Sequence, residues 1–222
     1  MTALIRYRPH GAGILDRNKR DGAVLVLGDT MKSASVWSDM SGRGNHGLVY
    51  GAGTPPAATP GALGYIFDGV DDYVAIGTDF GSGGFALGAR RDINTISLYV
   101  TDGWVDFTYT VNINTFYHFA VISDVVVGKT YIYINGVYVG ETIKVLTKSF
   151  TYSVWALSLS VTTSDRERIF NRNAANDFRI GFFYNEANAW NGSIDEVRIF
   201  NRALSATEIK RLYERTRILF GV

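Results

Sequence analysis

The stretch from Trp190 to Tyr213 constrains the fold most, because it joins a strand to a helix that has a defined start. From Glu196 to Phe200, polar residues alternate with large apolar ones, a period of two that predicts a strand with one buried face. Ser205 is followed three residues later by Glu208, which is the spacing of a capping box at a helix N-terminus. The sequence therefore predicts a late sheet strand leading into a short helix that begins near Ser205 and folds back onto the protein.

A β-hairpin is predicted where Asn135-Gly136 separates two alternating segments, because this dipeptide suits the positive φ angles of a two-residue type I′ turn. In the first arm, tyrosines fall on one face and isoleucines on the other. Further strands are predicted at residues 23–27, 63–67, 73–76, 95–100, 105–111, 116–122, 153–161 and 179–184. Residues 162–177 are mostly polar, so we expect a long loop there.

The composition excludes several classes of function. Basic and acidic residues number 22 and 21, so no overall charge draws the chain to nucleic acid or to a membrane, and neither partner is expected. No apolar run reaches the roughly 18 residues of a membrane-spanning helix. The chain has no cysteine, which excludes disulfides and thiolate metal sites. No linker divides the sequence, and an apolar fraction of 46% suffices for a large core, so we expect a single domain.

Three motifs, in order along the chain, resemble those of laminin-G-like domains in the concanavalin A-like lectin/glucanase superfamily. The first runs from Asp39 to Gly47, the second is Phe67-Asp-Gly-Val-Asp-Asp-Tyr-Val74, and the third runs from Gly192 to Ile209. The resemblance implies an all-β jelly-roll sandwich of two antiparallel sheets with a short C-terminal helix. It assigns residues 35–222 to the jelly-roll domain and leaves residues 1–34 as either a leading strand of the sandwich or a docking arm.

The first motif also fits the glycine fingerprint of nucleotide-binding proteins. That fingerprint requires a helix after the glycines, and residues 48–56 show no helical pattern. We therefore expect Gly42 and Gly44 to serve a tight loop with positive φ.

The resemblance further implies a structural calcium ion, which this family often holds. Each motif contributes one candidate ligand, namely Asp39, Asp68 and Asp195. Calcium prefers carboxylate and carbonyl oxygens, which glycine-rich loops offer. The alternative is that these carboxylates accept hydrogen bonds from loop amides.

Carbohydrate binding requires exposed aromatic rings beside hydrogen-bonding side chains. The candidates are Tyr152, Trp155, Tyr184 and Trp190, of which the last two flank three asparagines. The alternative is that these rings fill the core of the sandwich or the edge of a sheet.

Catalysis is the least favoured function. Glycosidases use two carboxylates at a fixed separation, one of them as an acid. The related hydrolase motif places acids at alternate positions of one strand, whereas the comparable positions here are Ser193, Asp195 and Val197, so a single acid remains. The three histidines are scattered, and no Gly-x-Ser-x-Gly nucleophile motif occurs. We expect His46 and His118 to have structural roles and the protein to be no enzyme.

The N-terminal residues lack the apolar segment of a secretory signal, which favours a protein made in a host cytoplasm and exposed later as part of a phage virion. The segment from Glu214 to Val222 resembles the endings of laminin-G-like proteins met in phage genomes. We therefore expect a virion structural or decoration protein, homo-oligomeric, with capsid or tail proteins as partners and cell-surface glycans as ligands. A carbohydrate-binding adhesion module is the alternative. The apolar Ile218-Leu-Phe220 is expected to be buried against the protein's own sheet or a neighbour.

Overall fold

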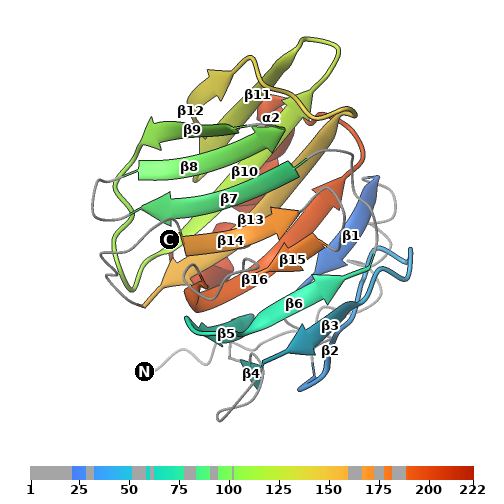
Figure 1. Cartoon of the computed structure of the whole chain (residues 1–222), viewed down its shortest axis with the longest axis vertical. Helices are drawn as coiled ribbons and strands as arrows, with labels where there is room; N and C mark the ends of the chain where they lie inside the picture. The colour runs from blue at the N-terminus through green and yellow to red at the C-terminus, as the bar shows by residue number, and fades with distance from the viewer. Residues whose placement is uncertain are drawn as a thin grey trace, which may run out of the picture.

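The computed structural model describes residues 22–28, 33–51, 59–60, 63–77, 84–90, 95–101, 103–159, 167–172, 178–181 and 189–222. In these residues the strands form two antiparallel eight-stranded sheets that pack face to face (Figure 1). The predicted all-β sandwich with a short C-terminal helix is therefore confirmed. Among the described residues, no helix is long and apolar enough to cross a bilayer.

Sheet A is organised around β16 (Asn191–Phe200), the predicted closing strand. The strand β13 (Phe150–Ser158) pairs along one edge of β16. The other edge is shared by β5 (Tyr65–Asp68), beside the N-terminal half of β16, and by β1 (Ala23–Leu27), beside its C-terminal half. The rest of sheet A comprises β10 (Phe116–Asp124), β11 (Lys129–Ile134) and β12 (Val137–Thr142) beyond β13, and β4 (Thr59–Pro60) beyond β5.

Sheet B lies nearer to the viewer in Figure 1 and carries no described helix. Its order across the sheet is β2 (Val36–Trp37), β3 (Gly47–Tyr50), β6 (Tyr73–Ile76), β15 (Phe178–Ile180), β14 (Glu167–Arg172), β7 (Gly84–Arg90), β8 (Thr95–Thr101) and β9 (Gly103–Thr108).

The strand β14 contradicts the predicted long loop at residues 162–177. Ile169 and Phe170 both lie in the hydrophobic core, although they are neighbours in the sequence. The register against β7 shifts between Arg168 and Phe170, which marks a bulge. A bulge interrupts the period of two, so the segment lacks the alternation by which a strand is recognised in a sequence.

The core fills the space between the sheets with large side chains from both. From sheet A, Tyr152 stacks on Phe85 of sheet B with ring centroids 4.3 Å apart and on Phe178 at 5.8 Å. The same core includes Trp37 and Trp190, which are fully buried. The rings hold the two sheets in a fixed relative position, because each side chain of this size buries well over 100 Å² of surface.

Helix α2 (Ala206–Thr216) begins with the predicted capping box. The Ser205 hydroxyl accepts the N–H of Glu208 at 3.3 Å, and the Glu208 carboxylate accepts the N–H of Ser205 at 2.9 Å. The apolar side of α2, with Ile209 and Leu212, packs against the outer face of sheet A in a second hydrophobic cluster. The helix therefore covers one outer face of the sandwich.

The short helix η3 (Arg217–Phe220) continues α2 and only partly confirms the expected burial of the apolar tail. Phe220 is buried and stacks on Trp155 with centroids 4.3 Å apart, so this ring packs against its own sheet. Ile218, in contrast, is 77% exposed.

Both predicted turns are also confirmed. The hairpin between β11 and β12 turns at Asn135 and Gly136, whose φ angles are 51° and 75°. In the first motif, Gly42 and Gly44 have φ angles of 80° and 77° and lie in a loop with no helix after it.

Candidate functional site

Asp39, the first candidate calcium ligand, is buried in the loop after β2. Its carboxylate accepts backbone N–H groups from Val26, Ser41 and Asn45 at 3.0, 2.8 and 3.0 Å, and the Ser41 hydroxyl at 2.8 Å. The N–H of Asp39 is donated to Nδ1 of His46 at 3.1 Å, so this histidine has the expected structural contact. These bonds connect β1 to the glycine-rich loop. They match the alternative stated for the calcium ligands, in which the carboxylate accepts hydrogen bonds from loop amides.

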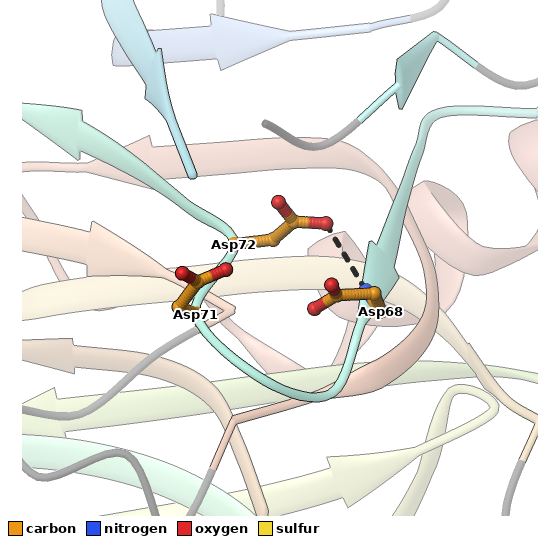
Figure 2. Close-up of side chains that lie close together, drawn as sticks. All are labelled: Asp68, Asp71 and Asp72. Carbon is orange, nitrogen blue, oxygen red and sulfur yellow. Dashed lines mark hydrogen bonds between the residues drawn. The ribbon is translucent and has the colours of Figure 1, made fainter. Parts of the chain in front are cut away.

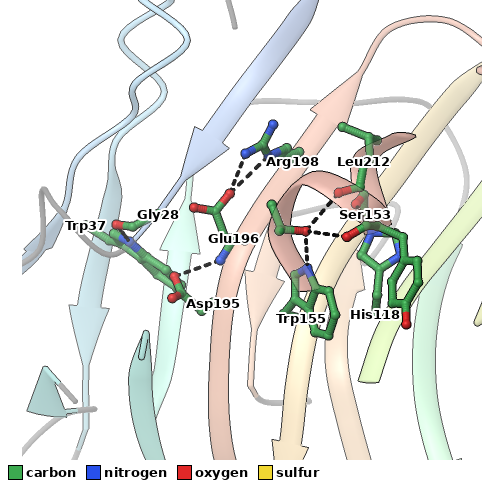
Figure 3. Close-up of polar contacts among 11 residues, drawn as sticks. Gly28, Trp37, His118, Ser153, Trp155, Asp195, Glu196, Arg198 and Leu212 are labelled. Carbon is green, nitrogen blue, oxygen red and sulfur yellow. Dashed lines mark hydrogen bonds and ion pairs between the residues drawn. The ribbon is translucent and has the colours of Figure 1, made fainter. Parts of the chain in front are cut away.

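Asp195 lies on β16 and is 1% exposed. Its Oδ1 accepts the N–H of Glu196 at 2.7 Å, as Figure 3 shows. Glu196 has a φ of 49°, and the pairing of β13 with β16 shifts register beside it, so both residues belong to a bulge. The Glu196 carboxylate pairs with Arg198 on the same strand.

The three predicted ligands do not come together. Within the described ranges, a single group of three acidic or histidine side chains has closely spaced ligand atoms, and it consists of Asp68, Asp71 and Asp72. Sequence reasoning selected Asp68 and missed the other two. Their signal was present, because all three lie within five consecutive residues of the second motif.

Figure 2 shows this acidic cluster in the turn that joins β5 to β6. Each residue places one carboxylate oxygen within 4.8 Å of the others. Asp72 is 4% exposed, and its Oδ2 accepts the N–H of Asp68 at 3.1 Å. Its Oδ1 is buried and has no hydrogen-bond partner in the part of the chain that the structure describes. Burial, followed by the negative charges of Asp68 and Asp71, raises the pKa of Asp72 to about 6.

The predicted sugar platforms are wrong for three of the four aromatic residues. Tyr152 and Trp190 lie in the core between the sheets, and Trp155 is 1% exposed although it points away from that core. The reason is that α2 and η3 cover this part of sheet A: the Trp155 ring stacks on Phe220, and its Nε1–H is donated to Thr216 Oγ1 at 2.7 Å. The fourth candidate, Tyr184, lies outside the described residues.

His118 and Ser153 form a buried pair next to Trp155 (Figure 3). Nε2 of His118 lies 2.8 Å from Oγ of Ser153, and burial, with the positive charge of Arg198 as the second cause, lowers the pKa of His118 to about 3. A serine and a histidine at this distance have the geometry of a nucleophile and a base. Here both are 3% exposed or less, beneath α2, so the pair packs the helix onto the sheet.

The outer face of sheet B carries a continuous row of residues that the strand registers place opposite one another. The cross-strand pairs run from Leu48 through Ala75, Arg179, Asn171, Ala86 and Tyr99 to Trp104. Residues directly opposite in antiparallel strands share a face, and the flanking residues of each strand face the core. In the middle of the row Asn171 and Ala86 are buried, and Nδ2 of Asn171 has no hydrogen-bond partner among the described residues.

Aromatic rings and arginines stand together on both sides of this row. On one side Tyr50, which is 42% exposed, stacks on Tyr73 with centroids 5.0 Å apart, and the Arg179 guanidinium lies 4.6 Å above the Tyr73 ring. On the other side the Arg168 guanidinium lies 4.2 Å above the Trp104 ring. We call this set of residues the sheet B face. No sequence motif marked it, because its members come from strands far apart in the chain.

A match to a family model fits this architecture. Residues 160–210 match the model of the concanavalin A-like lectin/glucanases superfamily, a region that includes the whole of the third sequence motif. The matched region and the two antiparallel sheets agree with the jelly-roll sandwich that the sequence predicts. A comparison of this chain with curated proteins found no match.

Solved structures with the same fold include enzymes and toxin domains. Trypanosoma rangeli sialidase, in complex with 2,3-difluoro-KDN, is 14% identical with a TM-score of 0.58, over 90% of this chain and 33% of the sialidase. The binding domain of Paraclostridial mosquitocidal protein 1 is 12% identical with a TM-score of 0.50, over 89% of this chain and 53% of that domain. The binding domain of botulinum neurotoxin DC, in complex with SialylT, is 13% identical with a TM-score of 0.50, over 89% and 52%. This chain thus spans a third to a half of these proteins, and the likeness concerns the fold alone.

Proposed function

We propose that this protein is a non-enzymatic carbohydrate-binding domain that binds glycans on the sheet B face. One observation carries the proposal: on the outer face of sheet B, over which no described helix lies, the exposed Tyr50 lies beside the Tyr73–Arg179 pair, at one end of a row whose middle residues are buried. The other outer face is closed by α2.

The chemistry of the sheet B face suits a sugar. A pyranose ring has an apolar C–H face that stacks on an aromatic ring and a rim of hydroxyls that accept hydrogen bonds from guanidinium and amide groups. Tyr50 offers an accessible ring, and the half-buried Arg179 brings donors next to the Tyr73 ring, whereas Arg168 is 6% exposed and orders the Trp104 ring from below the surface. The arginine charges favour ligands with a carboxylate, since guanidinium binds carboxylate with two parallel hydrogen bonds.

Two structural neighbours support carbohydrate as the ligand class. The sialidase structure contains 2,3-difluoro-KDN, and one structure of the botulinum neurotoxin DC binding domain contains SialylT. Because the identities are low, these titles support the class of ligand and carry no residue assignment to this chain.

The positions of the acids support a binding role over a glycosidase. In the related hydrolase motif, acids occupy alternate positions of one strand. The corresponding positions on β16 are Ser193, Asp195 and Val197, and the single acid, Asp195, is 1% exposed. Asp72 has a raised pKa, but at 4% exposure its carboxyl is enclosed by the protein. A glycosidase requires two carboxyl groups that both reach the sugar, one of them to protonate the leaving oxygen.

The test is a glycan array with the full chain, followed by calorimetry on the best ligand with the variant Tyr50→Ala. We expect a loss of at least about fivefold in affinity, because each contributing ring-to-sugar contact is worth roughly 1 kcal/mol or more. Tyr138→Ala is the matched control, because Tyr138 is 50% exposed and lies on β12 of the other sheet.

Equal affinities of the two variants would place the binding site elsewhere. Absence of binding to any glycan, or release of reducing sugar from a polysaccharide panel, would refute the proposed function. The assignment to a phage virion, with capsid or tail proteins as partners and a homo-oligomeric state, stays a prediction.

A further inference from the structure

We propose that a pocket beside α2 binds a doubly charged tetrahedral oxyanion, with a phosphate group as the expected ligand. The pocket lies where α2 covers the outer face of sheet A, on the opposite side of the sandwich from the sheet B face. The proposal therefore does not depend on the proposed glycan binding.

The size of the pocket fits a small ion. Its volume is about 100 Å³. A cavity of about 150 Å³ holds one benzene molecule, so this pocket has room for roughly four or five non-hydrogen atoms, which is the size of a phosphate or sulfate group. The apolar part of the lining consists of Phe200, at the end of β16, and of Leu204 and Leu212, which are all buried. These side chains belong to the second hydrophobic cluster, so the packing of α2 on sheet A fixes this wall of the pocket.

The charged part of the lining comes from one side of α2 and from the segment before it. Glu208, Arg211 and Arg215 follow one another at spacings of three and four residues, which places their side chains along one stripe of the helix. Arg202 precedes the helix and completes the set. All three arginines are exposed, so an ion can reach them from the solvent.

The charges of the lining select an anion. Three arginines and one glutamate line the pocket, so positive charge is in excess by two. Both oxygens of the Glu208 carboxylate are already engaged, because Oε1 accepts a hydrogen bond from Arg202 at 2.6 Å and Oε2 accepts the N–H of Ser205 at 2.9 Å. Glu208 therefore offers little to a ligand, and the attraction of the pocket comes from the arginines.

Arg211 is an independent indication of a ligand. Among the described residues it forms no ion pair, whereas Arg202 pairs with Glu208. Arg215 lies four residues further along the same side of α2, and like charges at this spacing destabilise a helix. An anion bound between Arg211 and Arg215 would replace this repulsion by two attractions.

A phosphate group suits these donors. Arginine cannot be deprotonated in proteins, and its guanidinium binds phosphate with two parallel hydrogen bonds. A phosphate monoester carries a charge of about −1.5 to −2 and three strong acceptor oxygens, so it can neutralise the excess charge and reach more than one arginine. A carboxylate carries a single charge and leaves half of the excess in place. The buried apolar wall keeps water from one side of the ion, which strengthens these attractions.

The test is titration calorimetry of the full chain at constant ionic strength with glycerol 3-phosphate, inorganic phosphate, sulfate and acetate. At pH 8 we expect one site per chain, with a Kd of about 1 mM or tighter for the phosphates, and at least about tenfold weaker binding of acetate. The second pKa of a phosphate ester is about 6, so the affinity for glycerol 3-phosphate should fall at pH 5, whereas that for sulfate, which keeps both charges, should not. Tighter binding of the ester than of inorganic phosphate would identify a phosphorylated molecule as the source of the ligand, and the reverse would identify free phosphate.

Arg211→Gln should weaken phosphate binding by about tenfold, because it removes a charged hydrogen-bond donor from the pocket. Arg211→Lys should bind with intermediate affinity, since it keeps the charge and loses the paired donors. Lys210→Gln is the matched control, because Lys210 is the neighbouring exposed residue of α2 and does not line the pocket. This variant loses the same charge and should bind like the wild type. Both positions are exposed, so the variants should fold, and their melting temperatures check this.

The proposal is overturned if the wild-type chain shows no saturable binding of phosphate or sulfate up to about 10 mM. It is also overturned if Arg211→Gln and Lys210→Gln weaken binding equally, because the overall charge of α2 would then attract the ion without the pocket. Acetate bound as tightly as phosphate would contradict the requirement for two charges.

Discussion

Replacing Thr216 by valine should weaken the packing of α2 on sheet A, because the Thr216 hydroxyl is the acceptor for the buried indole N–H of Trp155. Thr216 Oγ1 accepts this N–H at 2.7 Å and donates to the carbonyl of Leu212 at 2.8 Å. Trp155 is 1% exposed, so water cannot replace the lost acceptor. Valine has nearly the same shape as threonine, so the substitution removes the hydrogen bonds with little change in packing.

The expected cost follows from these two bonds. A buried donor left without a partner costs about 1–3 kcal/mol, and the methyl group that replaces the hydroxyl recovers a small part of this in apolar contact. We therefore expect Thr216→Val to lower the free energy of unfolding by roughly 2 kcal/mol. In a chain that already carries Trp155→Phe, which has no indole N–H, the same substitution should cost less than about 1 kcal/mol.

Urea unfolding of the four proteins of this double-mutant cycle measures the coupling, and the remaining tryptophans, Trp37, Trp104 and Trp190, report unfolding by fluorescence in every variant. If Thr216→Val lowers the free energy of unfolding equally in the wild type and in the Trp155→Phe chain, the reasoning is refuted. Thr216→Ser keeps the hydroxyl and serves as the control for the lost methyl group.

Two further predictions concern charge and capping. In calcium-free buffer, the stability of the wild type relative to Asp72→Asn should fall as the pH rises from 5 to 8. The pKa of Asp72 is raised from 3.8 to about 6, so the folded protein holds a proton that the unfolded chain has released, and this contribution is lost as the pH passes 6. The full change, from below pH 4 to above pH 6, amounts to roughly 3 kcal/mol, of which about half falls between pH 5 and 8. Paired urea titrations at each pH measure it, and a constant difference would contradict the assignment. Ser205→Ala should destabilise the protein by about 1 kcal/mol by removing the acceptor for the N–H of Glu208, whereas Ser205→Asp should retain most of the stability in the same assay.

Local signals predicted most of the architecture. The hairpin at Asn135-Gly136 and the cap at Ser205 depend on residues close together in the chain, so the sequence alone could reveal them. The strand β14 escaped because its bulge places Ile169 and Phe170 side by side in the core and hides the period of two. A register shift of this kind depends on the partner strand, which a pattern within one segment does not contain.

The candidate sites depended on longer-range information. The helix α2, about fifty residues further along the chain, determines whether Trp155 is exposed. The alternation within β13 could place the Trp155 ring on the outer face, but it could not show that a helix covers this ring. The sheet B face arises from pairings between β3, β6, β15, β14, β7, β8 and β9. The acidic cluster was the opposite case, because its three aspartates lie within five residues of the sequence. The sequence analysis chose one aspartate from each motif, and the fold does not bring those three residues together.

The central position of β16 has a consequence for how the protein folds. This strand follows every other strand in the sequence, yet it pairs with β13, β5 and β1 and so fills the middle of sheet A. Until it has been synthesised, those three strands lack a neighbour and expose unpaired backbone edges, which are sites of aggregation. Closing the sheet also requires contacts between residues far apart in the sequence, such as Ala23 with Phe200, which slows folding. We therefore expect that sheet A cannot close until β16 has left the ribosome. Ribosome-bound fragments that stop short of β16 should depend on chaperones to stay in solution.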